Sequence, residues 1–329
     1  MSIPKVPQGH PRVYVRPEDL PAIRAKIGDP AFAEDWRTIR RYADRAAPPE
    51  AALRAPAWGG SDPLAGSPLC CALIYLLTGE RDYGTRAIEQ TLQILPESDD
   101  ARTFHMPFHW AACVYDWCYD LLSLDQRQAF IREFIRIAGL RPSRYPAIPE
   151  CQAVLGHYSE GWLLTGQLPA GVAIYDESPT MYDAAAKVFF EKFVPVRNYH
   201  YASHAHHQGD HYTTRIIYDL GASWLFRRMG AGDVLSRDQQ FVPYQYVYNL
   251  LPNRRQFMRG DGTGDIRSGR RKTIMMLAGS YYADGLLLAL ADSDLFDNQL
   301  SPFHEVFELL LRPAGVEPRA MADLPLTKS

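Results

Sequence analysis

The stretch GSPLCCALIYLLTGE, Gly66 to Glu80, is apolar on nearly every side of the helix that it would form. A surface helix carries a single apolar stripe, whereas a helix that is apolar all round is buried between its neighbours. The stretch is also shorter than the roughly 20 apolar residues that cross a membrane. We therefore expect a buried helix with other helices packed around it.

A second stretch, SLDQRQAFIREFIRIAGL from Ser123 to Leu140, has a strong helix start. Ser123 is an N-cap residue, and Gln126 follows three positions later, as in a capping box. The apolar residues fall on one helical face; they are Phe130, Phe134, Ile137 and Ala138. This segment predicts an amphipathic helix.

Helical patterns continue along the chain, with Pro and Gly at their ends. They cover residues 16–30, 178–195, 211–230, 271–291 and 301–312. Residues 241–251 fit either a strand or a helix after Pro243. Helices of this length joined by Pro/Gly loops favour paired antiparallel helices, so we expect an all-α fold.

Composition excludes several classes of protein. The chain has 329 residues, a net charge of −3 and a pI near 6.4, which disfavours binding to nucleic acid or to a membrane surface. Its five cysteines include no Cys-x-x-Cys pair, which argues against a disulfide framework or a zinc ribbon. Cys113 and Cys118 should fill core space as small hydrophobic residues. No Gly-x-Ser-x-Gly elbow or Walker loop occurs.

The N-terminal residues, MSIPKVPQGHPRVYV, contain no apolar stretch of signal-peptide length. This leaves the cellular location open between an intracellular protein and one whose leader lies outside this sequence.

Three groups of residues could carry chemistry. In LGHYSEGW, Leu155 to Trp162, His157 and Glu160 would share one helical face. In YHYASHAHHQGDHY, Tyr199 to Tyr212, five of the ten histidines lie within twelve residues, and histidines serve where protons move near neutral pH. In residues 253–272, seven Arg or Lys stand against two Asp, as an anionic ligand requires.

Each group also has a simpler interpretation. The His157–Glu160 pair could be the start of a helix with a solvated face. The histidines, with Asp210, could bind zinc, although no familiar ligand spacing is present. The basic loop could be a solvated surface.

The opening HPRVYVRPEDLPAIRAKI, His10 to Ile27, resembles the start of bacterial heparinase II/III-type polysaccharide lyases. GHYSE has the His-x-x-Glu spacing of the heparinase II motif, and Tyr212, 55 residues after His157, resembles the catalytic tyrosine of that family. The resemblance implies an incomplete (α/α) toroid of paired antiparallel helices over residues 1–315. It also implies that residues 316–329 are a linker toward a β-sandwich domain that is not in this chain.

The resemblance further implies that the protein cleaves a uronic-acid polysaccharide of the heparin or heparan sulfate type by β-elimination. A base takes the C5 proton and an acid protonates the leaving O4, while the carboxylate is neutralised. We expect Tyr212 to act as base and acid, with its pKa lowered from about 10 by its surroundings. His157 would neutralise the uronate or lower that pKa, and Glu160 would sit against the uronate.

Other residues are candidates for binding the substrate, chosen from their type. They are His206, His207, Gln208, Arg254, Arg255 and Arg259, with Trp110 and Trp162 as stacking platforms. We expect no cofactor and no metal in this chain, although the resembling enzymes leave a metal in the β domain open. The expected partner is an anionic polysaccharide, with no nucleic acid and no membrane, and a homodimer is an open option. The resembling enzymes are periplasmic or secreted.

Alternative functions are a lyase for another uronate such as alginate, a uronyl C5-epimerase, and a sugar-binding toroid without catalysis. A glycoside hydrolase would need two opposed carboxylates, for which Asp116, Asp120, Asp261 and Asp265 are available.

Overall fold

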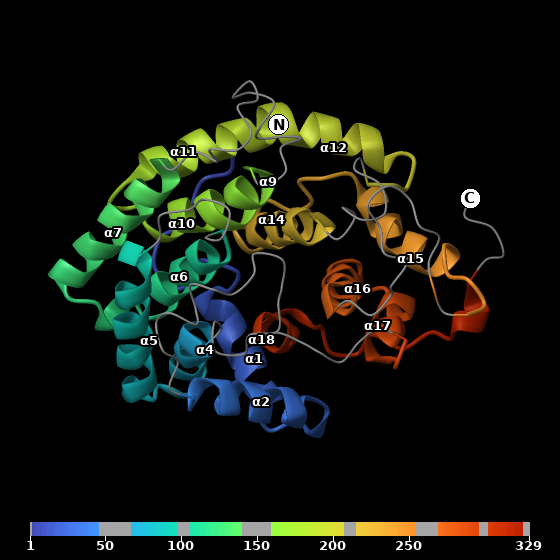
Figure 1. The fold of residues 1–329 in the computed structure, drawn as a ribbon, viewed down its shortest axis with the longest axis horizontal. Coiled ribbons are helices and arrows are strands. Elements are labelled where there is room, and N and C mark those ends of the chain that lie inside the picture. The colour runs from blue at the N-terminus through green and yellow to red at the C-terminus, as the bar shows by residue number, and fades with distance from the viewer. Residues whose placement is uncertain are drawn as a thin grey trace.

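The computed structural model describes residues 2–45, 67–97, 105–139, 159–206, 215–253, 255, 269–295 and 302–324, to which all structural statements below refer. These residues form helices and connecting segments and contain no strand (Figure 1). The predicted all-α fold class is therefore confirmed. None of the described helices is long and apolar enough to cross a membrane.

Within the described residues, six helical stretches contact one another in a closed order, and the sixth returns to the first. We call them the inner helices. They are α4 (Ser67–Thr78), α6 (His105–Trp117), α9 with η5 and α10 (Ser159–Gly161, Trp162–Gln167, Leu168–Ala173), α14 (Ile216–Arg228), α16 (Gly269–Tyr282) and α18 (Pro302–Leu311).

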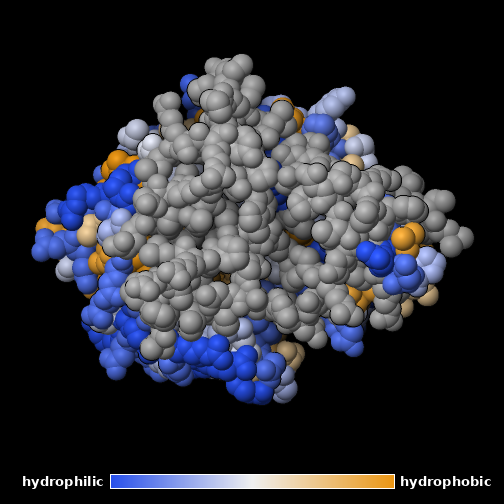
Figure 2. All heavy atoms as spheres, viewed as in Figure 1, coloured by the Kyte–Doolittle hydropathy of each residue, from blue (hydrophilic) through white to orange (hydrophobic). Residues whose placement is uncertain are grey.

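Other helices alternate with these in sequence and lie toward the rim of the molecule (Figure 1). They are α2 (Ala33–Ala43), α5 (Arg81–Ile94), α7 (Leu124–Gly139), α11 with η6 and α12 (Pro179–Val188, Phe189–Phe193, Val194–Tyr201), η8 with α15 (Arg237–Tyr244, Gln245–Tyr248) and α17 (Gly285–Asp292). Where Figure 2 shows described residues at this rim, hydrophilic ones predominate around α2 and the hydrophobic ones are scattered.

Neighbouring inner helices contact each other start to start and end to end. The Thr273 hydroxyl and His304 Nδ1 lie 2.9 Å apart near the starts of α16 and α18. At the opposite end, Leu76 of α4 and Trp117 of α6 line the same pocket, each close to the end of its helix. These pairs indicate that neighbouring inner helices run in the same direction.

The local predictions hold where the signal is strong. Ser123 N donates to Gln126 Oε1 over 2.9 Å, and Gln126 N donates to Ser123 Oγ over 3.2 Å, which is the predicted capping box of α7. The apolar face of α7 is buried at Phe130, Phe134 and Ile137 and partly buried at Ala138. In α4, ten of the twelve residues are buried. Cys113 and Cys118 are fully buried, as predicted.

Residues 271–291 form two helices where the sequence pattern runs on as one. Ala283 adopts a left-handed backbone conformation with φ +52°, which ends α16. The Asp284 side chain then accepts hydrogen bonds from Leu286 N and Leu287 N and caps α17. For residues 241–251, the helical alternative is correct up to Tyr248.

An N-terminal strap, residues 7–26, crosses the C-terminal ends of the inner helices and includes η1 (Pro17–Asp19) and α1 (Leu20–Lys26). The last carbonyl groups of a helix lack partners inside it and attract cations. Three cations of the strap donate to such carbonyls: Arg12 to Ala173 O (3.0 Å), Arg24 to Leu76 O (3.2 Å), and Lys26 to Leu309 O (2.7 Å) and Arg312 O (2.6 Å).

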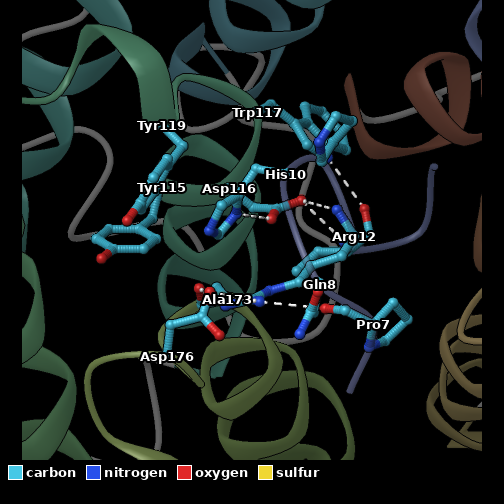
Figure 3. A network of polar contacts seen from close by, with 12 residues as sticks. Pro7, Gln8, His10, Arg12, Tyr115, Asp116, Trp117, Tyr119, Ala173 and Asp176 are labelled. Carbon is cyan, nitrogen blue, oxygen red and sulfur yellow. Dashed lines mark hydrogen bonds and ion pairs between the residues drawn. The ribbon is translucent and has the colours of Figure 1, made fainter. Parts of the chain in front are cut away.

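Asp116, near the end of α6, anchors this strap (Figure 3). Its Oδ2 accepts the backbone N–H groups of Arg12 and Val13, each over 2.8 Å, and its Oδ1 lies 2.6 Å from His10 Nδ1. Trp117 Nε1 donates to Val13 O over 3.0 Å. A buried carboxylate with three donors therefore fixes the chain that leads to Tyr14.

Tyr14 is 1% exposed and lies among the inner helices. Its ring contacts those of His109 of α6 and Phe307 of α18, and its backbone has φ +62°. Side chains from η5, α14 and α16 help to line a cavity of about 30 Å³ beside it. Tyr14 thus fills space between all these helices, at a backbone conformation that a bulky residue rarely adopts.

The described part of the predicted linker contacts the start of α17. Arg319 N donates to Gly285 O over 3.2 Å, and a Cβ added to Gly285 would lie 1.9 Å from Glu317 O. Only glycine permits this approach of two backbones.

The role of Tyr14 predicts a contrast between two substitutions. Tyr14→Ala removes a buried ring and should lower the free energy of unfolding by about 3–5 kcal/mol. Tyr14→Phe should change it by less than about 1 kcal/mol, because the buried hydroxyl has no hydrogen-bond partner among the described residues. Urea unfolding of both variants measures the difference, and equal losses would contradict the packing role.

Candidate functional site

The candidate site is built on Glu160, at the start of α9, which is 1% exposed. Its Oε1 accepts from Arg215 Nη1 over 2.8 Å, and its Oε2 accepts from Arg197 Nη2 over 2.5 Å. Arg215 immediately precedes α14 and Arg197 belongs to α12. One carboxylate therefore joins the starts of two inner helices to an outer helix.

The network continues through Asp219 of α14. Arg197 Nε donates to Asp219 Oδ2 over 2.8 Å, and the Tyr201 hydroxyl donates to the same oxygen. Tyr201 in turn accepts from Gln239 Nε2 of η8 over 3.5 Å. Among the described residues, two carboxyl groups and two guanidinium groups thus lie together in one buried cluster.

Burial dominates the electrostatics of the cluster. It raises the pKa of Glu160 to about 7, while Arg197 and Arg215 act in the opposite direction. Burial and the Asp219 charge raise the pKa of Tyr201 well above its usual value, which keeps its hydroxyl a donor. The cluster is a buried salt-bridge network rather than an exposed set of charges.

This geometry corrects the predicted role of Glu160. We expected its carboxyl group to sit against the uronate, but both of its oxygens bind arginines and almost none of its surface is exposed. Its partners Arg197 and Arg215, and Asp219 beyond them, were not predicted from the sequence. Arg197 and Tyr201 lie four residues apart and both bind Asp219, and this spacing on one helical face was the local signal for part of the network.

Most of the other predicted site residues lie outside the described residues. They are His157, Tyr212, His207, Gln208, Arg254 and Arg259. Of the remaining histidine and arginine candidates, His206 is buried at 5% exposure, whereas Arg255 is exposed and donates its backbone N–H to Asn253 Oδ1 over 3.1 Å.

The two tryptophans predicted to stack on sugar rings are core residues. Trp110 is 4% exposed and Trp162 is 6% exposed. The Trp162 ring packs edge-on against Phe108, at 5.7 Å between centroids. Neither ring has an exposed face on which a sugar could stack, so the prediction that these tryptophans stack on sugar rings is wrong.

Two other chemical expectations concern metals and hydrolysis. The described residues contain no group of three or more His, Cys, Asp or Glu side chains placed to hold a metal ion. Asp116 binds His10 and two backbone amides, and Asp120 accepts from the Tyr75 hydroxyl over 2.7 Å. Asp116 is therefore committed to the fold, which weighs against it as one of two hydrolase carboxylates.

A second buried acidic group lies between α18 and α2. Glu305 is 5% exposed, and its Oε2 has no hydrogen-bond partner in the described part of the chain. Burial, with a smaller contribution from the charge of Asp35, raises the pKa of Glu305 to about 7. Burial likewise raises the pKa of Asp35 to about 7. These carboxyl groups favour the protonated form in the folded protein.

No protein-family model matches this chain, and a search of curated proteins finds no match either.

The Glu160 network predicts coupled effects on stability. Glu160→Gln and Arg215→Gln should each lower the free energy of unfolding by about 3–5 kcal/mol, because each leaves its partner in a buried, unbalanced setting. The double variant should lose less than the sum of the two. Denaturant unfolding measures all three, with Arg37→Gln of the exposed Glu34 pair as a control that should lose under about 1 kcal/mol. Strict additivity would show that the two side chains do not interact.

Glu305 predicts a dependence of stability on pH. Its folded pKa lies above the unfolded value of about 4.3, so the folded state holds the proton more tightly. This contribution to stability is lost as the pH rises from about 4.5 to about 7. Glu305→Gln should therefore be more stable than the wild type at pH 8, by about 3 kcal/mol, and gain much less at pH 4.5. Urea unfolding at both values measures this, and a gain that does not depend on pH would contradict the burial argument.

Proposed function

We propose that this protein is a polysaccharide lyase of the heparinase II/III-like type, built on an (α/α) toroid. It would cleave uronic-acid-containing polysaccharide of the heparin or heparan sulfate class by β-elimination. The proposal rests on the sequence resemblance, the arrangement of the helices and one buried ion pair.

The helix contacts support a toroid. Inner and outer helices alternate along the chain, and α18 contacts α4, so the inner helices follow one another around a closed path. The sequence resemblance implied an incomplete toroid, whereas these contacts favour a closed one.

The ion pair between Glu160 and Arg215 is the observation that carries the proposal. Glu160 follows His157 by three residues, and Arg215 follows Tyr212 by three residues. Three residues of extended chain span at most about 11 Å. The pair therefore joins two described residues that each follow a predicted catalytic residue closely in sequence, although the pair itself spans 55 positions.

Helix direction supports an anionic substrate at this end of the molecule. The starts of α9 and α14 meet at the ion pair, and the starts of α16 and α18 also lie together. Helix N-termini carry partial positive charge and attract anions. In sequence, the basic residues 254–272 run directly into the start of α16. A uronate carboxylate would be stabilised in such a setting.

In the proposed reaction, Tyr212 in its phenolate form takes the proton from C5 of the uronate. Electrons of the broken C5–H bond form the C4–C5 double bond as the C4–O4 bond breaks, and the tyrosine returns the proton to the leaving O4. His157 stabilises the charge that develops on the carboxylate. Glu160, held by its two arginines, orients the segment that carries His157 rather than touching the sugar.

Substitution of Tyr212 tests the proposed function. The double bond formed by β-elimination absorbs in the ultraviolet, so the wild type should raise absorbance on at least one polysaccharide in a panel of heparin, heparan sulfate and alginate. Tyr212→Phe should lower the rate by about 10²–10⁴-fold, the usual contribution of general acid–base catalysis, while binding is retained.

The matched control is Tyr199→Phe, which changes a tyrosine that is 80% exposed on α12 and should keep the wild-type rate. Full activity of Tyr212→Phe would reject the assigned base. Exchange of the C5 hydrogen with deuterated solvent, without a rise in absorbance, would identify an epimerase instead. Binding without either signal would identify a non-catalytic toroid.

A further inference from the structure

A second site lies at the opposite ends of the inner helices. A pocket of about 480 Å³ opens between the N-terminal strap, the end of α4, the end of α6 and η4 (Tyr119–Leu121). This volume is within the range of small-ligand sites, about 300–1,000 Å³. The Glu160 network joins the starts of α9 and α14, so the pocket is separate from the candidate catalytic end.

The pocket walls are held in place by contacts already described. Asp116 fixes His10 and the strap on one side (Figure 3). The His10 ring stacks on Tyr119 at 3.7 Å between centroids, and the Arg127 guanidinium lies 4.0 Å from the centroid of the Tyr119 ring. Across the pocket, the Tyr75 hydroxyl donates to Asp120 over 2.7 Å. These contacts hold the side chains that line the pocket in defined positions.

The acidic side chain that remains available in the pocket is Asp120, because Asp116 is already engaged by three donors. His10 Nδ1 must donate to Asp116, because Asp116 is a carboxylate that accepts two further N–H groups. The other ring nitrogen, Nε2, is buried and has no hydrogen-bond partner among the described residues, so it does not face a ligand in the pocket. Asp120 is exposed and is bound only by Tyr75 among these residues.

The charges around the pocket also favour a positively charged ligand. The charged residues of the lining are Asp116, Asp120 and Arg24, and Arg24 already donates to the last turn of α4 at Leu76 O. Arg127, beside the Tyr119 ring, donates to the hydroxyl and the carbonyl group of Tyr119. The ends of α4 and α6 add the partial negative charge of helix C-termini. Tyr75 and Trp117 supply aromatic surface, whose faces attract cations.

We propose that this pocket binds a small organic cation, with its ammonium group at Asp120 and its apolar body against Tyr75 and Trp117. An ammonium group carries three N–H donors and a positive charge, which matches both the acceptors and the charge of the walls. A carboxylate ligand would meet Asp120 instead. The inference does not depend on the lyase proposal, because none of its residues belongs to the candidate catalytic end.

Three probes of similar size and different charge test the inference: cyclohexylamine as the cation, cyclohexanol as the neutral form and cyclohexanecarboxylate as the anion. Isothermal titration at neutral pH should show saturable binding of the cation, at least tenfold tighter than that of the alcohol, and no binding of the anion. Asp120→Asn keeps an acceptor for the Tyr75 hydroxyl but removes the charge, and should weaken cation binding at least tenfold.

Two further variants complete the test. Tyr75→Leu should also weaken cation binding, because it removes aromatic surface and the group that positions Asp120. Asp183→Asn changes an exposed carboxylate on α11, outside the pocket, and should bind the cation as the wild type does. No saturable binding of the cation, wild-type binding by Asp120→Asn, or tighter binding of the anion would each overturn the inference.

Discussion

Inner helices that run in the same direction bring their last carbonyl groups to one end of the molecule, and these acceptors need donors. The N-terminal strap supplies them through Arg12, Arg24 and Lys26. Asp116 holds the strap by accepting two of its backbone N–H groups. The same strap carries Tyr14 into the space between the helices. Closure of one end and packing of the interior therefore depend on a single segment and one buried carboxylate.

The other end is organised by charge pairs. Glu160 binds Arg197 of α12 and Arg215 at the start of α14. Arg197 also forms an ion pair with Asp219. Burying such charged groups costs desolvation free energy. The attraction between the partners offsets this cost only in a defined geometry. The network therefore favours one arrangement of these helices over others. Both oxygens of Glu160 bind these arginines, where the resemblance had led us to expect a carboxyl group that sits against a uronate.

The two ends differ in the ligands that they favour. The helix starts at one end carry partial positive charge, which agrees with the anionic substrate that we propose, whereas the helix ends, Asp120 and aromatic side chains at the other end agree with the proposed cation. One feature of the fold bears on both ends: neighbouring inner helices share a direction, so their dipoles add. An anion would be attracted by the partial positive charge of the helix starts, and a cation by the partial negative charge of the helix ends.

The sequence by itself determined what depends on neighbours within a few positions. It predicted the all-α class, the Ser123–Gln126 capping box and the burial of α4, because periodicity and capping are local. The break between α16 and α17 was not predicted. The helical pattern of the sequence continues across it, and Asp284 caps the start of α17 within that pattern. Only the tertiary structure decided that Trp110 and Trp162 are buried and that Glu160 pairs with Arg197 and Arg215, which lie 37 and 55 positions away. Such pairings are set by how helices pack, and residue type alone does not distinguish a carboxylate that meets a ligand from one that holds the fold.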